Sequence, residues 1–153
     1  MLKNAIWITG AEGRLGSALM ALLKKDMENK VVGTDLDVDI TKMEEVEQCI
    51  KVYRPNIVIN CASISDADYC EQNMVKAFKV NALGARNLAA ASRSANAKII
   101  QLSTDDVFSG KKAGQLTEFD LPDPESVYGK SKFAGENYVK ELNLNVDSTV
   151  LIC

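Results

Sequence analysis

A phenol and an ammonium group four residues apart are the clearest chemical feature of this sequence. Tyr128 and Lys132 occur in the run Tyr128-Gly129-Lys130-Ser131-Lys132, whose spacing places both side chains on one face of a helix. A phenol with a pKa of about 10 is a poor acid near neutral pH, but a neighbouring cation lowers that pKa. We therefore expect a proton donor for a developing alkoxide, with Lys132 also available to a ribose. The alternative is an ordinary pair on the surface of a helix.

Thr104 is the third candidate for this chemistry. It follows an extended apolar run at residues 98–102, and its hydroxyl could hold a substrate oxygen. The chain contains no histidine, which excludes a Ser-His-Asp triad, an imidazole base and a histidine-bound metal. The cysteines show no zinc spacing, so we expect no metal site and reduced, buried thiols instead. They are Cys49, Cys61, Cys70 and Cys153.

A glycine-rich turn at residues 10–16 predicts a site for a dinucleotide. Gly10, Gly13 and Gly16 lie between an apolar run and an amphipathic helix, where backbone N–H groups can approach a diphosphate. Asp35 lies 19 residues after Gly16, and its carboxylate would accept hydrogen bonds from a ribose and repel a 2′-phosphate. Arg14 could instead attract a phosphate, or simply begin a solvated helix, so the choice between NAD and NADP stays open. The alternative for the whole turn is a plain connection between strand and helix.

Strand and helix patterns alternate along the chain, which is typical of a doubly wound parallel sheet with helices on both faces, a Rossmann-like α/β fold. We expect strands at residues 5–9, 31–34, near Val38, and at 57–59, 98–102 and 149–153. We expect helices at 15–23, at 43–53 after a Thr41-to-Glu44 capping box and before Pro55, at 74–94 and at 127–142. Residues 109–125 should form an irregular loop. The apolar end predicts one domain, 1–153, truncated within its last strand.

The composition suits one compact domain. Apolar residues make up 46% and charged residues 25% of the chain, and the net charge is −3. Such a balance favours neither nucleic acid nor a membrane surface as a partner. The apolar run near the amino terminus is shorter than a signal-peptide core or a membrane span, so we expect a cytoplasmic protein.

Several motifs together resemble the extended short-chain dehydrogenase/reductases, and within them the dTDP-4-dehydrorhamnose reductase family. The resemblance extends over essentially the whole chain, and its most diagnostic parts are residues 103–108 and 128–136. The other matching stretches are residues 8–16, 39–41, 54–60 and 80–88. In that family NADPH or NADH reduces the 4-keto group of a dTDP-linked deoxysugar.

The resemblance implies roles for individual residues. It makes Thr104, Tyr128 and Lys132 catalytic, and places Thr104, Val107 and Phe108 near the substrate. The cofactor would contact Gly10, Gly13, Arg14, Leu15, Gly16, Asp35, Asp39, Ile40, Cys61, Ala62, Ser63, Asn81, Tyr128 and Lys132. Asp68 and Glu71 match a family pair, although a surface or helix-capping role fits them equally. Ile64 and Asp106 stand where the family commonly has tyrosine, so the exact sugar stays open.

The expected partners are therefore a dinucleotide and a nucleotide sugar, with a homodimer as a further option. The rival expectations are a nucleotide-sugar epimerase or dehydratase of the same superfamily, and a dinucleotide-binding regulatory subunit or fragment without activity. An epimerase or dehydratase would show no net consumption of NAD(P)H.

Overall fold

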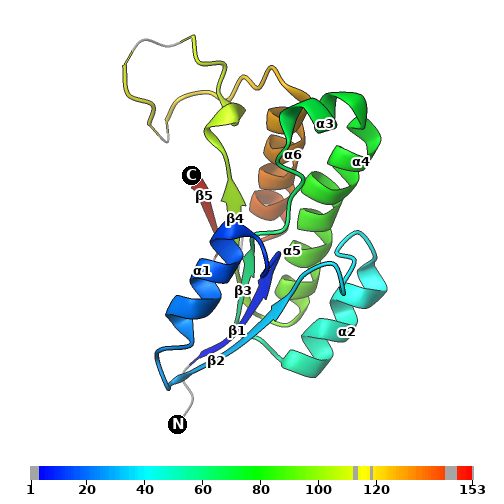
Figure 1. The fold of residues 1–153 in the computed structure, drawn as a ribbon, viewed down its shortest axis with the longest axis vertical. Coiled ribbons are helices and arrows are strands. Elements are labelled where there is room, and N and C mark those ends of the chain that lie inside the picture. Colours follow the sequence, from blue (N-terminus) through cyan, green and yellow to red (C-terminus); the bar gives the residue numbers. More distant parts are fainter. Residues whose placement is uncertain (1–3, 112–113, 118, 144–147, 153) are drawn as a thin grey trace.

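A five-stranded parallel sheet forms the centre of the molecule. The computed structural model describes residues 4–111, 114–117, 119–143 and 148–152 (Figure 1). The strands are β1 (Asn4–Thr9), β2 (Asn29–Thr34), β3 (Ile57–Asn60), β4 (Lys98–Ser103) and β5 (Ser148–Ile152). Their order is β2-β1-β3-β4-β5, and every neighbouring pair is parallel. All five carboxyl ends therefore meet at one edge of the sheet.

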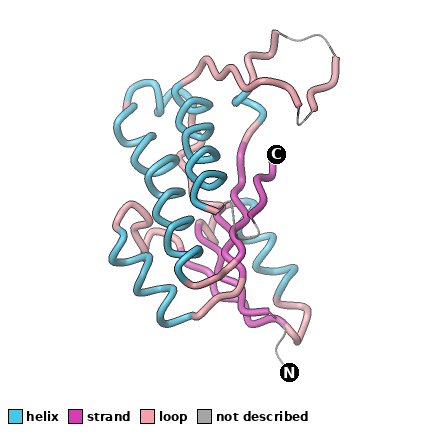
Figure 2. The backbone as a smooth tube through the Cα atoms, turned by 180° about the vertical axis from the view of Figure 1, so that it is seen from behind, coloured by secondary structure: helices cyan, strands magenta, loops and turns pink. Residues whose placement is uncertain are grey.

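Helices cover both faces of the sheet, which confirms the doubly wound prediction. Alternate residues of β1 divide between two cores: Ile6 and Ile8 pack with α1 (Arg14–Leu23), while Trp7 packs with α2 (Met43–Tyr53) and α5 (Ala85–Ser94). Figure 1 shows α1 on one side of the sheet and α2, α5 and α6 (Val127–Leu142) on the other, and Figure 2 shows these three from behind. The predicted helices at 15–23 and 127–142 are confirmed.

The predicted strand near Val38 is wrong, because residues 35–41 form turns. The N–H of Val38 donates to the carbonyl of Asp35. Carboxylates accept neighbouring N–H groups in the same segment: Asp37 Oδ1 from Asp35 N at 2.6 Å, and Asp39 Oδ1 from Thr41 N at 3.0 Å. These local bonds compete with the ladder of a sheet.

The predicted capping box is also wrong. Lys42 is the residue before α2, and none of the described residues caps the helix through a side chain there. The Thr41 hydroxyl instead donates to Asp39 Oδ1 at 2.7 Å, because a carboxylate is the stronger acceptor. In the predicted capping box the Glu44 carboxylate would accept the N–H of Thr41, whereas in the structure Glu45 accepts the N–H of Asp39 at 2.7 Å.

The helix predicted over residues 74–94 is interrupted. It consists of α4 (Met74–Phe78), a π-helical turn η1 (Lys79–Gly84) and α5, preceded by an unpredicted short helix α3 (Ala67–Gln72). Asp66 caps α3 by accepting the N–H of Tyr69 at 2.9 Å. π-Helical turns within α-helices often occur at functional sites, and this one contains Asn81.

The remaining predictions concern the carboxyl-terminal third. A 3₁₀ turn, η2 (Asp105–Val107), follows β4, and the described parts of residues 109–125 form an irregular loop that extends away from the sheet (Figure 1). The last strand is confirmed as β5, although Cys153 lies outside the described residues. No helix among the described residues has the length and apolar character needed to cross a bilayer.

Candidate active site

Two adjoining cavities form one cleft along the carboxyl edge of the sheet. Both are lined by Gly10, Gly13, Cys61 and Ser63, so they are halves of a single space. The first, of about 610 Å³, is also lined by Asp35, Asp39, Ile40, Ala62 and Val80. The second, of about 600 Å³, is also lined by Arg14, Leu15, Gly16, Thr104, Tyr128 and Lys132. Because β1 leads to a helix on one face and β3 to helices on the other, the cleft lies at the topological switch point, where such sheets bind ligands.

The glycine turn packs tightly against the loop after β3. Gly10 has φ +65°, and a Cβ there would lie 2.6 Å from Ala62 N. A Cβ on Gly16 would lie 2.1 Å from the carbonyl oxygen of Gly10. Side chains at these positions would force the turn apart, so the glycines keep the backbone at the floor of the cleft.

The amino terminus of α1 offers donors to a ligand. Gly13 precedes the helix, none of the described residues caps it through a side chain, and its first turn contains no acidic residue. The first intrahelical bond runs from Ser17 N to Gly13 O at 2.9 Å. The N–H groups of Arg14, Leu15 and Gly16 therefore precede the helical ladder. Such N–H groups and the positive end of the helix dipole fit a diphosphate.

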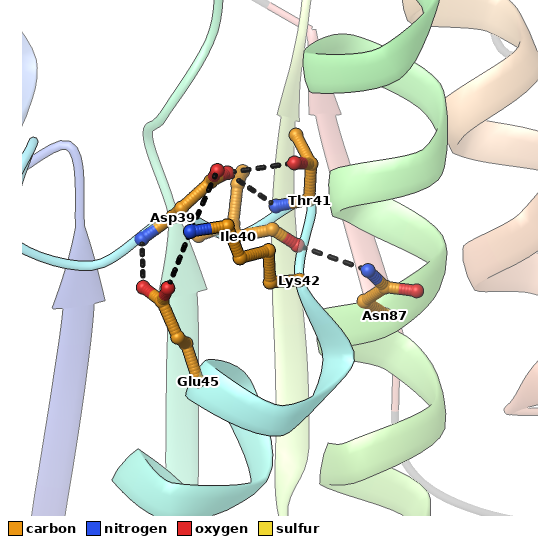
Figure 3. Close-up of polar contacts among 6 residues, drawn as sticks. All are labelled: Asp39, Ile40, Thr41, Lys42, Glu45 and Asn87. Atoms are coloured by element: carbon orange, nitrogen blue, oxygen red, sulfur yellow. Dashed lines mark hydrogen bonds and ion pairs between the residues drawn. The ribbon is translucent and has the colours of Figure 1, made fainter.

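The loop between β2 and α2 is held rigidly at the other end of the cleft (Figure 3). Bonds with Thr41 hold the pKa of the Asp39 carboxyl below its ordinary value, and Lys42, 3.8 Å away, acts in the same direction. Asn87 Nδ2 donates to the carbonyl of Ile40 at 3.1 Å. The side chain of Ile40 is buried and forms part of the cleft wall.

The end of β4 and one face of α6 are joined by two hydrogen bonds. They join Leu102 O to Lys132 Nζ (2.6 Å) and Ser103 Oγ to a Glu136 carboxylate oxygen. Thr104, the residue after β4, lines the second cavity beside Tyr128, and its hydroxyl lowers the pKa of that phenol. The predicted catalytic residues are thus brought together, and Lys132 is buried with its ammonium on a strand carbonyl.

Burial raises the pKa of Tyr128, and the hydrogen bond from Thr104 only partly offsets this effect. The direction is opposite to the one that we expected from Lys132. Desolvation disfavours the charged tyrosinate, and the ammonium of Lys132 is hydrogen-bonded to Leu102. The phenol therefore keeps its proton at neutral pH, as a proton donor must.

Asn81 lies behind the cleft and does not line it. Its side chain is buried, donates to Ile64 O and Ser131 Oγ at 2.9 Å each, and accepts from Ile64 N at 2.8 Å. Ser131 in turn donates to the carbonyl of Tyr128 at 2.8 Å. The structure thus gives Asn81 a positioning role between the β3 loop and α6, and shows no direct opening to a cofactor.

Glu71 has a capping role of the kind that the sequence left open. Its carboxylate accepts the N–H of Val127 at 2.7 Å, while Ser126 Oγ accepts the N–H of Gly129 at 2.9 Å. Together they fix the first turn of α6, which carries Tyr128. The sequence gives no local signal for the Glu71 contact, because the two residues come from separate helices.

Two predicted substrate residues lie elsewhere. Val107 and Phe108 line a separate cavity of about 410 Å³, shared with Glu136, Lys140 and Val150. Glu136 was missed, although it continues the spacing of Tyr128 and Lys132 by four more residues. Its buried carboxylate also contacts the ammonium of Lys140 at 3.1 Å.

The cysteines that the structure describes differ in their exposure. Cys49 and Cys70 are buried, and burial raises the pKa of both thiols, while Cys61 lines the cleft. Within the part of the chain that the structure describes, no cluster of three or more potential ligands could hold a metal ion.

A glycine turn at the switch point of a parallel sheet, together with a Thr-Tyr-Lys group beside it, is the arrangement typical of the α/β domains of short-chain dehydrogenase/reductases. The chain belongs to the family described as RmlD substrate binding domain, whose sequence model matches residues 4–151.

Named relatives agree with this assignment. The dTDP-4-dehydrorhamnose reductase of Aggregatibacter actinomycetemcomitans is 39% identical over 145 residues, which are 94% of this chain and 49% of that protein. A crystal structure of a dTDP-4-dehydrorhamnose reductase from Clostridium acetobutylicum is similar with a TM-score of 0.92 and 44% identity, over 96% of this chain and 52% of that one.

A dTDP-4-dehydrorhamnose reductase from Bacillus anthracis, in complex with NADP, gives a TM-score of 0.93 and 38% identity over 99% of this chain and 54% of that one. The chain therefore spans about half the length of the relatives that it matches.

Proposed function

We propose that this chain is the cofactor-binding part of an NAD(P)H-dependent reductase that acts on the 4-keto group of a dTDP-linked deoxysugar. The relatives named as dTDP-4-dehydrorhamnose reductases support the reaction class. The single observation that carries the proposal is the second half of the cleft, where Thr104, Tyr128 and Lys132 lie beside the glycine turn.

The residues of the cleft fit the cofactor. The N–H groups that begin α1 would hold the diphosphate, Asp35 the adenosine ribose, and the wall containing Ile40 and Val80 the adenine. Cys61 and Ser63 line both halves of the cleft and Ala62 lines the first half, so these residues would contact the cofactor where it crosses from one half to the other. When bound, reduced nicotinamide supplies a hydride for the ketone carbon.

The protein's own residues supply the proton and the orientation. Thr104 and Tyr128 would both hydrogen-bond the ketone oxygen, and the Tyr128 hydroxyl would give its proton to the alkoxide that forms. Lys132 would hold the nicotinamide ribose and place positive charge near the resulting tyrosinate, which lowers the free energy of that charged state. Lys132 and Thr104 are both buried, which holds their polar groups in place at this end of the cleft.

The test measures binding first and turnover second. We expect NADH or NADPH to bind, detected by nicotinamide fluorescence, and to be consumed with a dTDP-4-keto-6-deoxysugar. Tyr128→Phe should retain binding and lower consumption by about 100-fold or more, whereas Tyr138→Phe, on the same helix, serves as the matched control. Failure to bind either cofactor would reject the proposal. Binding without consumption would instead favour a regulatory role for this chain.

The resemblance also leads us to propose a homodimer. Light scattering of the purified chain tests it, and a monomeric mass at high protein concentration would reject it.

A further inference from the structure

A row of three buried polar side chains crosses the sheet beside the cleft. Thr9 and Asn60 form the last pair of the β1–β3 ladder, and Asn60 and Gln101 form the last pair of the β3–β4 ladder. Each of the three residues is 1% exposed. The residues two positions earlier in each strand belong to the core that contains α2 and α5, so the alternation of a strand turns the row to that same side of the sheet.

Hydrogen bonds join the row from strand to strand. Thr9 Oγ1 donates to Asn60 Oδ1 at 2.7 Å, and Asn60 Nδ2 donates to Gln101 Oε1 at 2.8 Å. Asn60 Oδ1 also accepts the N–H of Ala62 at 3.1 Å. Gln101 Nε2 in turn donates to the carbonyl of Leu102 at 2.9 Å. Because both the oxygen and the nitrogen of the Gln101 amide have a partner, its orientation is fixed.

The carbonyl at which the row ends is also the carbonyl that holds Lys132. Lys132 Nζ donates to Leu102 O at 2.6 Å, and both residues line the half of the cleft that contains Tyr128. Gln101 lines neither half. Leu102 O therefore accepts one bond from the buried row and one from a residue of the cleft. A carbonyl oxygen has two lone pairs, so the bond from Gln101 restricts the direction in which the other lone pair meets Lys132.

We propose that Gln101 is a positioning residue for Lys132 and acts through the carbonyl of Leu102. The inference rests on the proposed dinucleotide site, in which Lys132 holds the nicotinamide ribose, and deepens it. A lysine ammonium has three rotatable donors on a flexible stem, so a fixed acceptor is needed to hold it in one geometry. A buried polar network whose members are all paired supplies that rigidity. Without Gln101 the ammonium keeps its acceptor, but the acceptor loses the bond that fixes it.

The experiment compares two ligands that differ in the nicotinamide riboside, NADH and ADP, by titration calorimetry. Gln101→Met keeps the approximate length of the side chain and removes both polar groups. We expect the dissociation constant for NADH to rise about fivefold in this variant, and that for ADP to change by less than about twofold, because ADP does not extend to Lys132. A merely structural loss at the edge of the sheet would weaken both ligands alike.

A double-mutant cycle tests whether Gln101 acts through Lys132. Once Lys132→Met has removed the ammonium, adding Gln101→Met should change the NADH affinity by less than about twofold. Thr9→Val is the matched control, because it removes one bond of the same row and leaves both bonds to Leu102 O in place. It should leave the ratio of the two affinities unchanged. Gln101→Glu, as a carboxylate, still accepts from Asn60 and has no donor for Leu102 O, so it is the second variant should Gln101→Met not fold, and the same loss is expected.

Three results would overturn the positioning role: an NADH affinity of the Gln101 variant within twofold of wild type, an equal weakening of NADH and ADP, or an undiminished further loss in the Lys132→Met background. None of them would remove the dinucleotide site. Absence of NADH binding by the wild-type chain would instead reject the proposed function itself, so the two failures are distinguishable.

Discussion

Asn81→Ala is expected to cost about 2–5 kcal/mol of unfolding free energy, a large fraction for a domain of this size. Asn81 is buried and makes three hydrogen bonds of 2.8–2.9 Å, two to the backbone of Ile64 and one to Ser131. Alanine removes all three.

The magnitude follows from which groups lose their partner. The N–H of Ile64 loses its acceptor, and the carbonyl of Ile64 keeps only the weak thiol donor of Cys70 at 3.6 Å; a polar group left without its partner costs about 1–3 kcal/mol. Ser131 loses less, because its hydroxyl still donates to the carbonyl of Tyr128 at 2.8 Å. The loop after β3, which forms a wall of the cleft, should also loosen.

Urea unfolding followed by the fluorescence of Trp7 measures the change, since Trp7 is fully buried. The matched control is Asn73→Ala, which removes an exposed bond to the carbonyl of Tyr69 and should cost less than about 1 kcal/mol. The affinity for NADH, measured without denaturant, should fall in Asn81→Ala alone. A loss of stability no greater than that of Asn73→Ala would refute the reasoning.

Three further changes test separate parts of the site. Because burial raises the pKa of Tyr128, the protonated phenol contributes stability that is complete below about pH 10 and is lost as the pH rises through the folded-state pKa. In urea unfolding, Tyr128→Phe should therefore reduce the fall of the unfolding free energy at alkaline pH. A pH profile of stability that is unchanged in the variant would contradict this expectation. Gly16→Ala should weaken NADH binding by about tenfold or more, because its Cβ would meet the carbonyl of Gly10 at 2.1 Å, and a titration showing wild-type affinity would exclude this explanation. Glu71→Ala should cost about 1–2 kcal/mol in urea unfolding, since Val127 N loses its acceptor, and wild-type stability would show that water replaces it.

Local sequence patterns predicted the framework of this fold. The apolar run at residues 5–9 predicted β1, and the glycines of the first turn mark where the strand ends. Because successive side chains of a strand face opposite sides, Ile6 and Ile8 are separated from Trp7 in the structure. The spacing of Tyr128 and Lys132 requires only that residues 127–142 be helical, which they are. Such features are determined by neighbours in sequence, so they can be predicted without knowledge of the tertiary structure.

The parts that were not predicted depend on contacts between distant segments. Asn81 joins residues 17 and 50 positions away, and Glu71 reaches a helix 56 positions further on. Thr41 was assigned to a cap because the prediction could not weigh the carboxylate of Asp39 against a helical N–H. The raised pKa of Tyr128 has the same origin, because burial is a tertiary property whereas the four-residue spacing is local.

The position at which β4 ends explains why the three catalytic candidates meet. Leu102 packs on the α1 side of the sheet and Ser103 contacts α6, so alternation returns the side chain of Thr104 to the side of the cleft. Tyr128 can still reach it because Tyr128 lies in the first turn of α6, at the carboxyl edge, where no strand intervenes (Figure 1). The neighbouring Gly129 permits this approach, since a Cβ there would lie 2.2 Å from the carbonyl of Asp106.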